Sequence, residues 1–144
     1  MNTIYSESYI SDILKKVKTI AVVGASSKKD RDSYKVIQSL ITKGYKVFPV
    51  NPNECNKIIF GQKCFANLEN IQEDVDMVDV FRAKDAIMEV TKQAIDIGAK
   101  VLWMQEGLIN KEAANLAQSA GLQVVMDRCP KKELSKPYWT SQIK

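Results

Sequence analysis

The chain alternates between short, continuously apolar runs and longer stretches in which apolar residues recur at helical spacing. A typical helical stretch carries Val36, Ile37, Leu40 and Ile41 on one face and stops at Gly44. Apolar strands separated by amphipathic helices are typical of a parallel sheet that is covered on both faces. The five predicted strands are residues 18–23, 46–50, 76–81, 100–103 and 122–126.

Three further helices are predicted over residues 7–17 after the N-cap Ser6, along the stripe from Ile87 to the stop at Gly98, and from the cap Asn110 to Gly121. Residues 54–72 are less regular, with a short strand expected at 63–65 and a helical turn after Asn67. Residues 131–144 are expected to form a loosely packed tail. The pattern predicts one three-layer α/β/α Rossmann-like domain over residues 1–144.

The composition is that of an ordinary globular domain, with 45% hydrophobic and 26% charged residues among 144. The net charge is +4, but the basic residues are dispersed and aromatic residues do not interleave with them, so nucleic-acid binding is not predicted. No apolar run approaches the about 18 residues of a membrane span. Residues 1–7 lack the charged and apolar regions of a signal peptide, so we expect a cytoplasmic protein that makes no membrane contact.

The chain contains no histidine. This excludes Ser–His and Cys–His nucleophile pairs, acid–base catalysis by imidazole, and every metal site that needs histidine. The three cysteines, Cys55, Cys64 and Cys129, form no C-x-x-C motif, and their odd number argues against a disulfide framework. No metal site is therefore predicted.

The turn after the first predicted strand, residues 24–34, is the candidate phosphate loop. In open parallel sheets, ligands bind beyond the carboxyl ends of the strands, and backbone N–H groups at a helix N-terminus receive phosphate. Where a G-x-G-x-x-G loop has its second and third glycines, this chain has Ser26 and Lys29. Lys28, Lys29 and Arg31 indicate a ligand with more negative charge than NAD, and the alternative is that they are cations of a solvated loop. Arg31 is the best suited of them because a guanidinium binds phosphate bidentately.

The end of the second strand carries Asn51 and Pro52 instead of the acidic residue that holds the ribose in NAD-binding domains. An acid would repel a phosphorylated ribose. Its absence permits NADP or a ligand built on 3′-phospho-ADP, such as coenzyme A (CoA). The alternative is that Asn51 and Pro52 only form a turn.

Polar and reactive residues also follow the later strands. Phe81 is compatible with stacking on an adenine ring or with packing in the core, whereas Arg82 is better suited to neutralising a phosphate or a carboxylate. Gln105 is expected to hydrogen-bond the ligand. Glu106 is a candidate general base or a solvated carboxylate. Cys129 has no general base near it in the sequence, so no catalytic role is predicted for it.

These residues belong to longer motifs by which the chain resembles a family of small, single-domain CoA-binding proteins, which is related to the CoA-binding domain of the succinyl-CoA synthetase α subunit. The resemblance covers residues 7–134, and its motifs follow the predicted strands in order. They are Val23-Gly24-Ala25-Ser26, Arg31 with Ser33-Tyr34, the run 44–52 ending in Asn51-Pro52, the run 75–82 ending in Phe81-Arg82, the run 98–107 with Met104-Gln105, and the run 124–129 ending in Asp127-Arg128-Cys129.

The resemblance implies a five-stranded parallel sheet of order 3-2-1-4-5, with residues 24–34 around the CoA pyrophosphate. It implies these cofactor-binding residues: Gly24, Ala25, Ser26, Lys29, Arg31, Ser33, Tyr34, Asn51, Pro52, Phe81, Arg82, Met104 and Gln105. Two departures matter. The synthetase has a lysine just beyond the second-strand proline, where this chain has Asn53 and Glu54. Many relatives have a histidine shortly after the Asp-Arg-Cys motif, and this chain has none.

The expected function is non-covalent binding of CoA or an acyl-CoA, without catalytic turnover by this chain alone. One alternative is an NADP-dependent oxidoreductase, in which Tyr34 or Glu106 would have to handle the proton. The other is a regulatory or subunit-like module whose protein partner supplies the chemistry. A second copy of the chain as partner is compatible with each of these.

Overall fold

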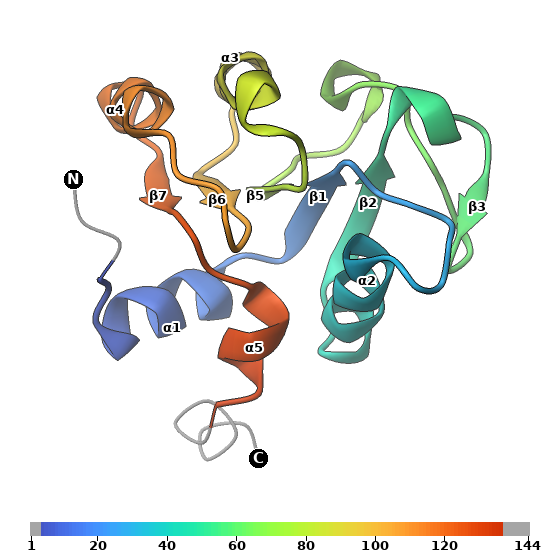
Figure 1. The fold of residues 1–144 in the computed structure, drawn as a ribbon, viewed down its shortest axis with the longest axis horizontal. Helices are drawn as coiled ribbons and strands as arrows, with labels where there is room; N and C mark the ends of the chain where they lie inside the picture. Colours follow the sequence, from blue (N-terminus) through green and yellow to red (C-terminus); the bar gives the residue numbers. More distant parts are fainter. Residues whose placement is uncertain (1–3, 137–144) are drawn as a thin grey trace.

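The computed structural model describes residues 4–136, and its centre is a five-stranded parallel sheet (Figure 1). The hydrogen-bonded order of the strands is β2-β1-β5-β6-β7. A separate two-stranded hairpin, β3 (Ile58–Ile59) and β4 (Gln62–Lys63), follows β2. The strands of the main sheet are β1 (Thr19–Val23), β2 (Lys46–Val50), β5 (Met77–Val80), β6 (Val101–Met104) and β7 (Gln123–Val125).

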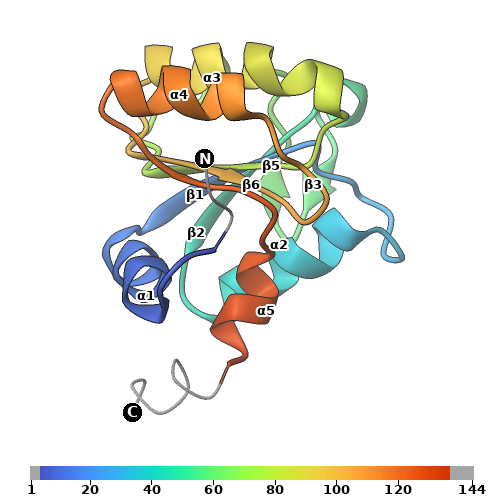
Figure 2. The same ribbon diagram turned by 60° about the vertical axis from the view of Figure 1, so that its left-hand side comes forward.

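Helices cover both faces of the sheet, which gives the three layers seen in Figure 2. One face carries α1 (Glu7–Lys16), α2 (Asp32–Thr42) and α5 (Pro130–Leu134), and the other carries α3 (Ile87–Asp96) and α4 (Lys111–Ser119). Short 3₁₀ turns lie at η1 (Pro52–Glu54), η2 (Leu68–Asn70) and η3 (Lys84–Ala86). The three-layer α/β/α class predicted from the sequence is therefore confirmed.

The strands are continuously apolar because both of their faces are buried. Along β1, Ala21 and Val23 pack on the α3 and α4 side, while Ile20 and Val22 pack on the α1, α2 and α5 side. This alternation is the normal consequence of the two-residue period of a strand. None of the helices among residues 4–136 is long and apolar enough to span a membrane.

The structure corrects the predicted place of residues 76–81 in the strand order. The order 3-2-1-4-5, with residues 76–81 as strand three, places them outside β2, but β5 pairs with β1 instead. The outer edge of β2 is taken by the chain that follows it, where the Phe65 N–H donates to the Pro49 carbonyl at 2.9 Å. Pro49 has no N–H of its own, so this edge cannot hold a full ladder. If the bridge at Phe65 is counted as strand three, the order becomes 3-2-1-4-5, with β7 as a sixth strand.

The structure also corrects the expectation that residues 131–144 form a loosely packed tail. Residues 130–134 form α5, which packs against α2, and Leu134 is completely buried. Pro130 suits the first turn of this helix because its missing N–H would have no partner there. The rest of the predicted tail, from residue 137 to 144, lies outside the described residues.

Candidate functional site

The first residue of the candidate phosphate loop, Gly24, lies against the exit of β5. Its φ is +96°, and a Cβ added there would lie 2.2 Å from the Phe81 carbonyl oxygen. Only glycine combines this backbone conformation with so close an approach. The ends of β1 and β5 are therefore in close contact at Gly24 and Phe81, where the turn after β1 begins.

The turn itself is held by Glu54 of η1. The Glu54 carboxylate accepts hydrogen bonds from the Ser27 N–H and hydroxyl, both at 3.0 Å, and pairs with Lys57 at 2.7 Å. The hydrogen bond from Lys57 is the main cause that lowers the pKa of Glu54 to about 2, with the Ser27 N–H next. Glu54 is only 8% exposed. A buried, charged brace therefore stands where the synthetase has its lysine.

Asn51 ties the second strand to the same turn. Its side-chain amide donates to the Ala25 carbonyl at 2.9 Å, and its side-chain oxygen accepts from the Asn53 N–H at 2.9 Å. The N–H groups of Gly24 and Ala25 both donate to the Val50 carbonyl, at 2.8 and 3.2 Å. The structure thus brings the predicted residues at the first two strand exits together, but it uses them to shape the turn.

These bonds limit which groups remain for a phosphate. The Ser27 and Lys28 N–H groups are also used, since Lys28 donates to the Ser26 hydroxyl at 3.1 Å. The N-cap of α2, Arg31, makes no side-chain cap, so the first turn of that helix keeps its anion-attracting end. Lys28, Lys29 and Arg31 are exposed around it. Positive charge and an open helix N-terminus coincide, as the loop sequence predicts.

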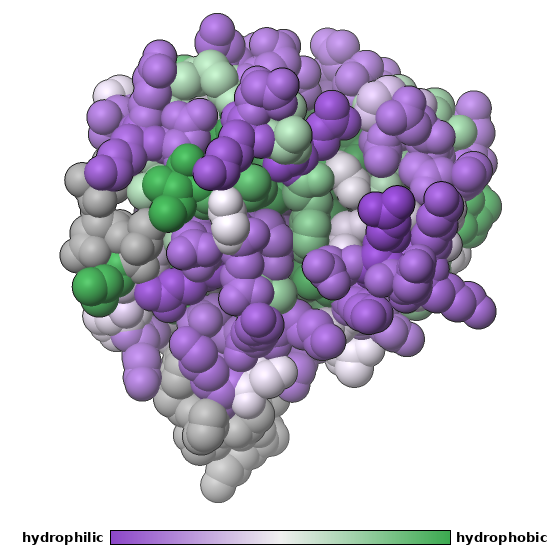
Figure 3. Space-filling model, in the orientation of Figure 1, coloured by the Kyte–Doolittle hydropathy of each residue, from purple (hydrophilic) through white to green (hydrophobic). Residues whose placement is uncertain are grey.

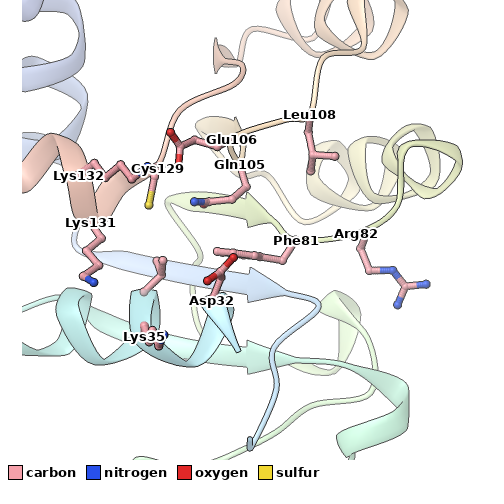
Figure 4. A pocket seen from close by; sticks show the side chains of 11 residues that line it. Asp32, Lys35, Phe81, Arg82, Gln105, Glu106, Leu108, Cys129, Lys131 and Lys132 are labelled. Atoms are coloured by element: carbon pink, nitrogen blue, oxygen red, sulfur yellow. Dashed lines mark ion pairs between the residues drawn. The ribbon is translucent and has the colours of Figure 1, made fainter. Parts of the chain in front are cut away.

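Two cavities flank the Gly24–Phe81 contact. The Cys129 cavity, about 360 Å³, lies where β5 and β6 end, between the start of α2 and α5 (Figure 4). The smaller Pro52 cavity, about 130 Å³, lies where β1 and β2 end, beside α3. Arg82 lines both cavities. Further lining residues are Asp32, Phe81, Gln105, Glu106 and Cys129 in the first, and Val23, Val50, Pro52, Glu89 and Val90 in the second.

A third and wider cavity, of about 560 Å³, lies beside the β3–β4 hairpin. It is lined by Cys55, Lys63 and Asn70 among others, and it contains none of the predicted site residues.

Figure 3 shows hydrophobic side chains in the middle of a largely hydrophilic face. We take the two cavities at the strand ends as the candidate site because parallel sheets bind ligands there.

Two buried polar groups near β5 and β6 have no hydrogen-bond partner among the described residues. Gln105 is 8% exposed, and its side-chain oxygen is buried and unpaired, although the side chain points into the Cys129 cavity. Asp79, in the middle of β5, is fully buried with both carboxyl oxygens unpaired. Burial raises the pKa of Asp79 well above its ordinary value. Such groups are rare in folded proteins and call for a structural or functional reason.

Nine of the thirteen predicted residues line neither cavity, and three of these nine are packed elsewhere. Met104 is completely buried in the core on the α3 and α4 side. Tyr34 packs against Phe60 of the β3–β4 hairpin, with ring centroids 4.4 Å apart. Ser33 is buried in the first turn of α2. Of the predicted side chains, those of Pro52, Phe81, Arg82 and Gln105 line the cavities.

Sequence reasoning assigned Glu54 no role in the site, although it noted that this position departs from the synthetase. Lys57 follows it by three residues, and a β-turn with Asn56 at positive φ brings that pair together. Cys129 and Glu106 were weighed as candidates but left out of the predicted set. Their shared cavity depends on α5, which the sequence analysis treated as a loose tail.

The fold is an α/β domain with two cavities at the ends of its parallel strands. The profile of a family described as a CoA binding domain matches residues 18–135, and the chain belongs to that family. It is 36% identical over 126 residues to the uncharacterized protein YneT of Bacillus subtilis, covering 88% of this chain and 92% of YneT.

Two further relatives widen the picture. A hypothetical protein from Pyrococcus horikoshii OT3 superposes with a TM-score of 0.85 at 39% identity, over 90% of each chain. An ADP-forming acetate–CoA ligase of Methanocaldococcus jannaschii is 25% identical over 83 residues. That match covers 58% of this chain and 12% of the ligase, so this chain is similar to one part of a much larger enzyme.

Proposed function

We propose that this chain binds CoA or an acyl-CoA non-covalently across the two cavities. The observation that carries the proposal is that Arg82 lines both of them, at the ends of parallel strands in a chain of the CoA-binding family. A ligand that spans both cavities must be long and anionic near its centre. CoA, with a nucleotide at one end, a pyrophosphate inside and a pantetheine arm, has that form.

Each part of such a ligand has residues suited to it. The Pro52 cavity is lined by Val23, Val50 and Val90 and is suited to the flat adenine ring. The open N-terminus of α2 and the cations before it suit the pyrophosphate. The side-chain amide nitrogen of Gln105, which points into the Cys129 cavity, suits an amide carbonyl of the pantetheine arm.

The proposal stops at binding. The chain matches 12% of the acetate–CoA ligase, and it has no histidine that could carry a phosphoryl group. Any acyl group on the ligand would lie at the Cys129 end, since the thiol is the far end of the pantetheine arm. A partner protein that uses the bound CoA is compatible with this proposal.

Arg82→Ala tests the proposal most directly. If Arg82 neutralises the ligand's charge, the substitution should weaken CoA binding by about 1.5–3 kcal/mol, the value of a charge-assisted hydrogen bond. Isothermal titration calorimetry measures the change. The matched control is Lys84→Ala, because Lys84 is an exposed cation two residues away that lines neither cavity. Equal losses in the two variants would reduce the role of Arg82 to general electrostatic attraction.

Arg31→Ala examines the phosphate loop in the same way. The expected loss is again about 1.5–3 kcal/mol of CoA affinity if one charged hydrogen bond to phosphate is removed. An unchanged affinity would take Arg31 out of the site and leave the pyrophosphate to the backbone of α2.

Ligand class is decided by two simple measurements. Native mass spectrometry of freshly purified protein should show an adduct with the mass of CoA or of a thioester. In a thermal-shift assay, CoA should raise the Tm and NADPH should not. Stabilisation by NADPH alone would instead favour the oxidoreductase.

A further inference from the structure

We propose that Cys129 exchanges its thiol with a disulfide of CoA, so that the chain captures the oxidised form of its ligand as a mixed disulfide. This inference rests on the proposed function, because it requires the pantetheine arm to enter the Cys129 cavity. It adds a covalent step to a site otherwise argued only from non-covalent fit.

The position of Cys129 is the first observation. Its side chain is 6% exposed overall, yet it lines the cavity, and Figure 4 shows its sulfur directed into that space. Lys131 and Lys132 line the same cavity from α5, where Lys132 pairs with Glu106 at 2.7 Å. A thiol in this position is largely buried, and the part of it that lines the cavity is accessible to solvent and to a ligand there.

Gln105 is the second and independent observation. Its buried amide oxygen has no partner among residues 4–136, and its side chain points into the cavity toward the Cys129 side. The end of the side chain that faces the cavity is its amide nitrogen, which can donate a hydrogen bond to a ligand there. The pantetheine arm carries amide carbonyl groups near its terminal sulfur. A ligand held by Gln105 therefore presents its sulfur close to the cysteine.

The direction of the ligand follows from the two cavities. One is lined by Phe81 with residues of α2 and α5, the other by Val23 with residues of α3, and they share Arg82. A nucleotide in the Pro52 cavity sends the arm past Arg82 into the Cys129 cavity. The thiol is the last atom of that arm, so it arrives on the side where Cys129 lies.

The other two cysteines do not share this setting. Cys55 is exposed and Cys64 is buried, and both line the third cavity beside the hairpin. Burial is the main cause that raises the pKa of Cys64 to about 11, which suppresses its reactive thiolate. Of the chain's three cysteines, Cys129 alone lines the candidate site.

The reaction is a thiol–disulfide exchange. The Cys129 thiol loses its proton to solvent, and the thiolate attacks one sulfur of CoA–S–S–CoA. A Cys129–S–S–CoA bond forms as the original S–S bond breaks, and one CoA thiolate leaves and is protonated. The disulfide of CoA supplies the oxidation, so no other oxidant is needed. A thiol reductant reverses the step.

The test uses the full chain carrying Cys55→Ser, which removes the exposed thiol without touching the core. This protein is incubated with CoA disulfide, and intact-mass spectrometry should show a gain of one CoA less two hydrogens. Peptide mapping should locate the adduct at Cys129. Cystamine, a disulfide without a nucleotide, serves as the matched probe. Because binding makes the reaction intramolecular, CoA disulfide should react roughly tenfold faster or more.

Competition supplies a readout that needs no change at the buried site. Desulfo-CoA has the nucleotide but no sulfur, and by occupying the site it should slow the reaction of CoA disulfide with Cys129. Adding Cys129→Ser should abolish the adduct. Equal rates with both disulfides, no protection by desulfo-CoA, or an adduct on Cys64 would each overturn the inference.

The two proposals fail in different ways. If desulfo-CoA binds the Cys55→Ser protein in calorimetry but no mixed disulfide forms, the exchange at Cys129 is wrong and the proposed function stands. If desulfo-CoA and CoA both fail to bind, the proposed function is wrong, and the exchange falls with it.

Discussion

Two regions of the site differ in whether their buried polar groups have hydrogen-bond partners. The first lies at the ends of β1 and β2, and the second near the ends of β5 and β6. At the first, Glu54 is 8% exposed and has Ser27 and Lys57 as partners, so it remains charged. At the second, Asp79 and Gln105 are just as buried and have unpaired oxygens. Burial keeps a carboxylate charged only where donors are supplied. The buried polar group beside β1 and β2 therefore has its hydrogen bonds within the protein, whereas those near the ends of β5 and β6 have unpaired oxygens.

This difference bears on how the site would work. The braced turn fixes the backbone at the phosphate end before any ligand arrives, which lowers the ordering cost of binding. The β5–β6 end is less satisfied and is less stable than it could be. Strain or unpaired groups of this kind are typical of functional sites, where stability is given up for binding.

The largest expected effect comes from breaking the junction between the two ends. Gly24→Ala should destabilise the fold by about 3–5 kcal/mol, because it adds positive-φ strain to a clash with the Phe81 carbonyl. Gly44→Ala is the matched control, since its φ is +98° but open space surrounds its Cβ position. It should cost about 1–2 kcal/mol. Denaturant unfolding compares the two, and equal losses would show that the close approach does not matter.

Glu54→Gln removes the charge of the braced end and should cost about 2–3 kcal/mol at pH 7. The folded-state pKa of about 2 lies below the ordinary 4.5, so the stabilisation is complete above about pH 5 and is lost as the pH falls toward 2. The variant should therefore lack the wild-type loss of stability in that window. Unfolding free energies measured from pH 7 to pH 2.5 check this. Glu69→Gln, at an exposed carboxylate, should behave like wild type.

Asp79→Asn should stabilise the protein at neutral pH, raising the Tm by several degrees. The raised pKa of Asp79 means that its contribution is most favourable below its ordinary 3.8 and is lost as the pH rises, because the unfolded chain then ionises and the folded chain resists. The gain in Tm over wild type should grow from pH 4 to pH 8. Asp74→Asn, on the surface, should show no such trend. A constant gain at all pH values would mean that Asp79 does not titrate differently in the two states.

The smallest effect, and the one that sharpens the comparison most, is expected for Gln105→Met. Replacing a buried unpaired acceptor by an apolar group of similar size should leave the free protein unchanged or stabilise it by about 1 kcal/mol. The same change should weaken CoA binding about tenfold, because the ligand loses the hydrogen bond donated by the Gln105 amide nitrogen. Thermal unfolding without ligand and calorimetry with CoA measure the two sides. Gln118→Met, on the exposed side of α4, should alter neither. A loss of stability without a loss of affinity would make Gln105 a structural residue.

Local pattern was enough for the elements of this fold. Residues 46–50 form a strand with the predicted bounds, and Ser6 and Asn110 cap α1 and α4 as expected. Such features depend on neighbours a few residues apart, so they are written in the sequence. The turn between β1 and α2 was equally visible, since an apolar strand that ends in glycine and leads into a helix is a local motif.

Tertiary structure decided which elements meet. Phe65 pairs with the outer edge of β2, where Pro49 has no N–H with which to continue a full ladder. Helix α5 is held against the domain by the buried Leu134, and its residues form one wall of the Cys129 cavity. The hydrogen bonds of Glu54 and the unpaired state of Asp79 also depend on which segments pack around them. Hydrogen-bond partners and burial come from segments far apart in the chain, and the free energy of a polar group depends on that environment. The sequence by itself determined the strands, the helices and the turn after β1, and long-range packing determined the chemistry of the residues around them.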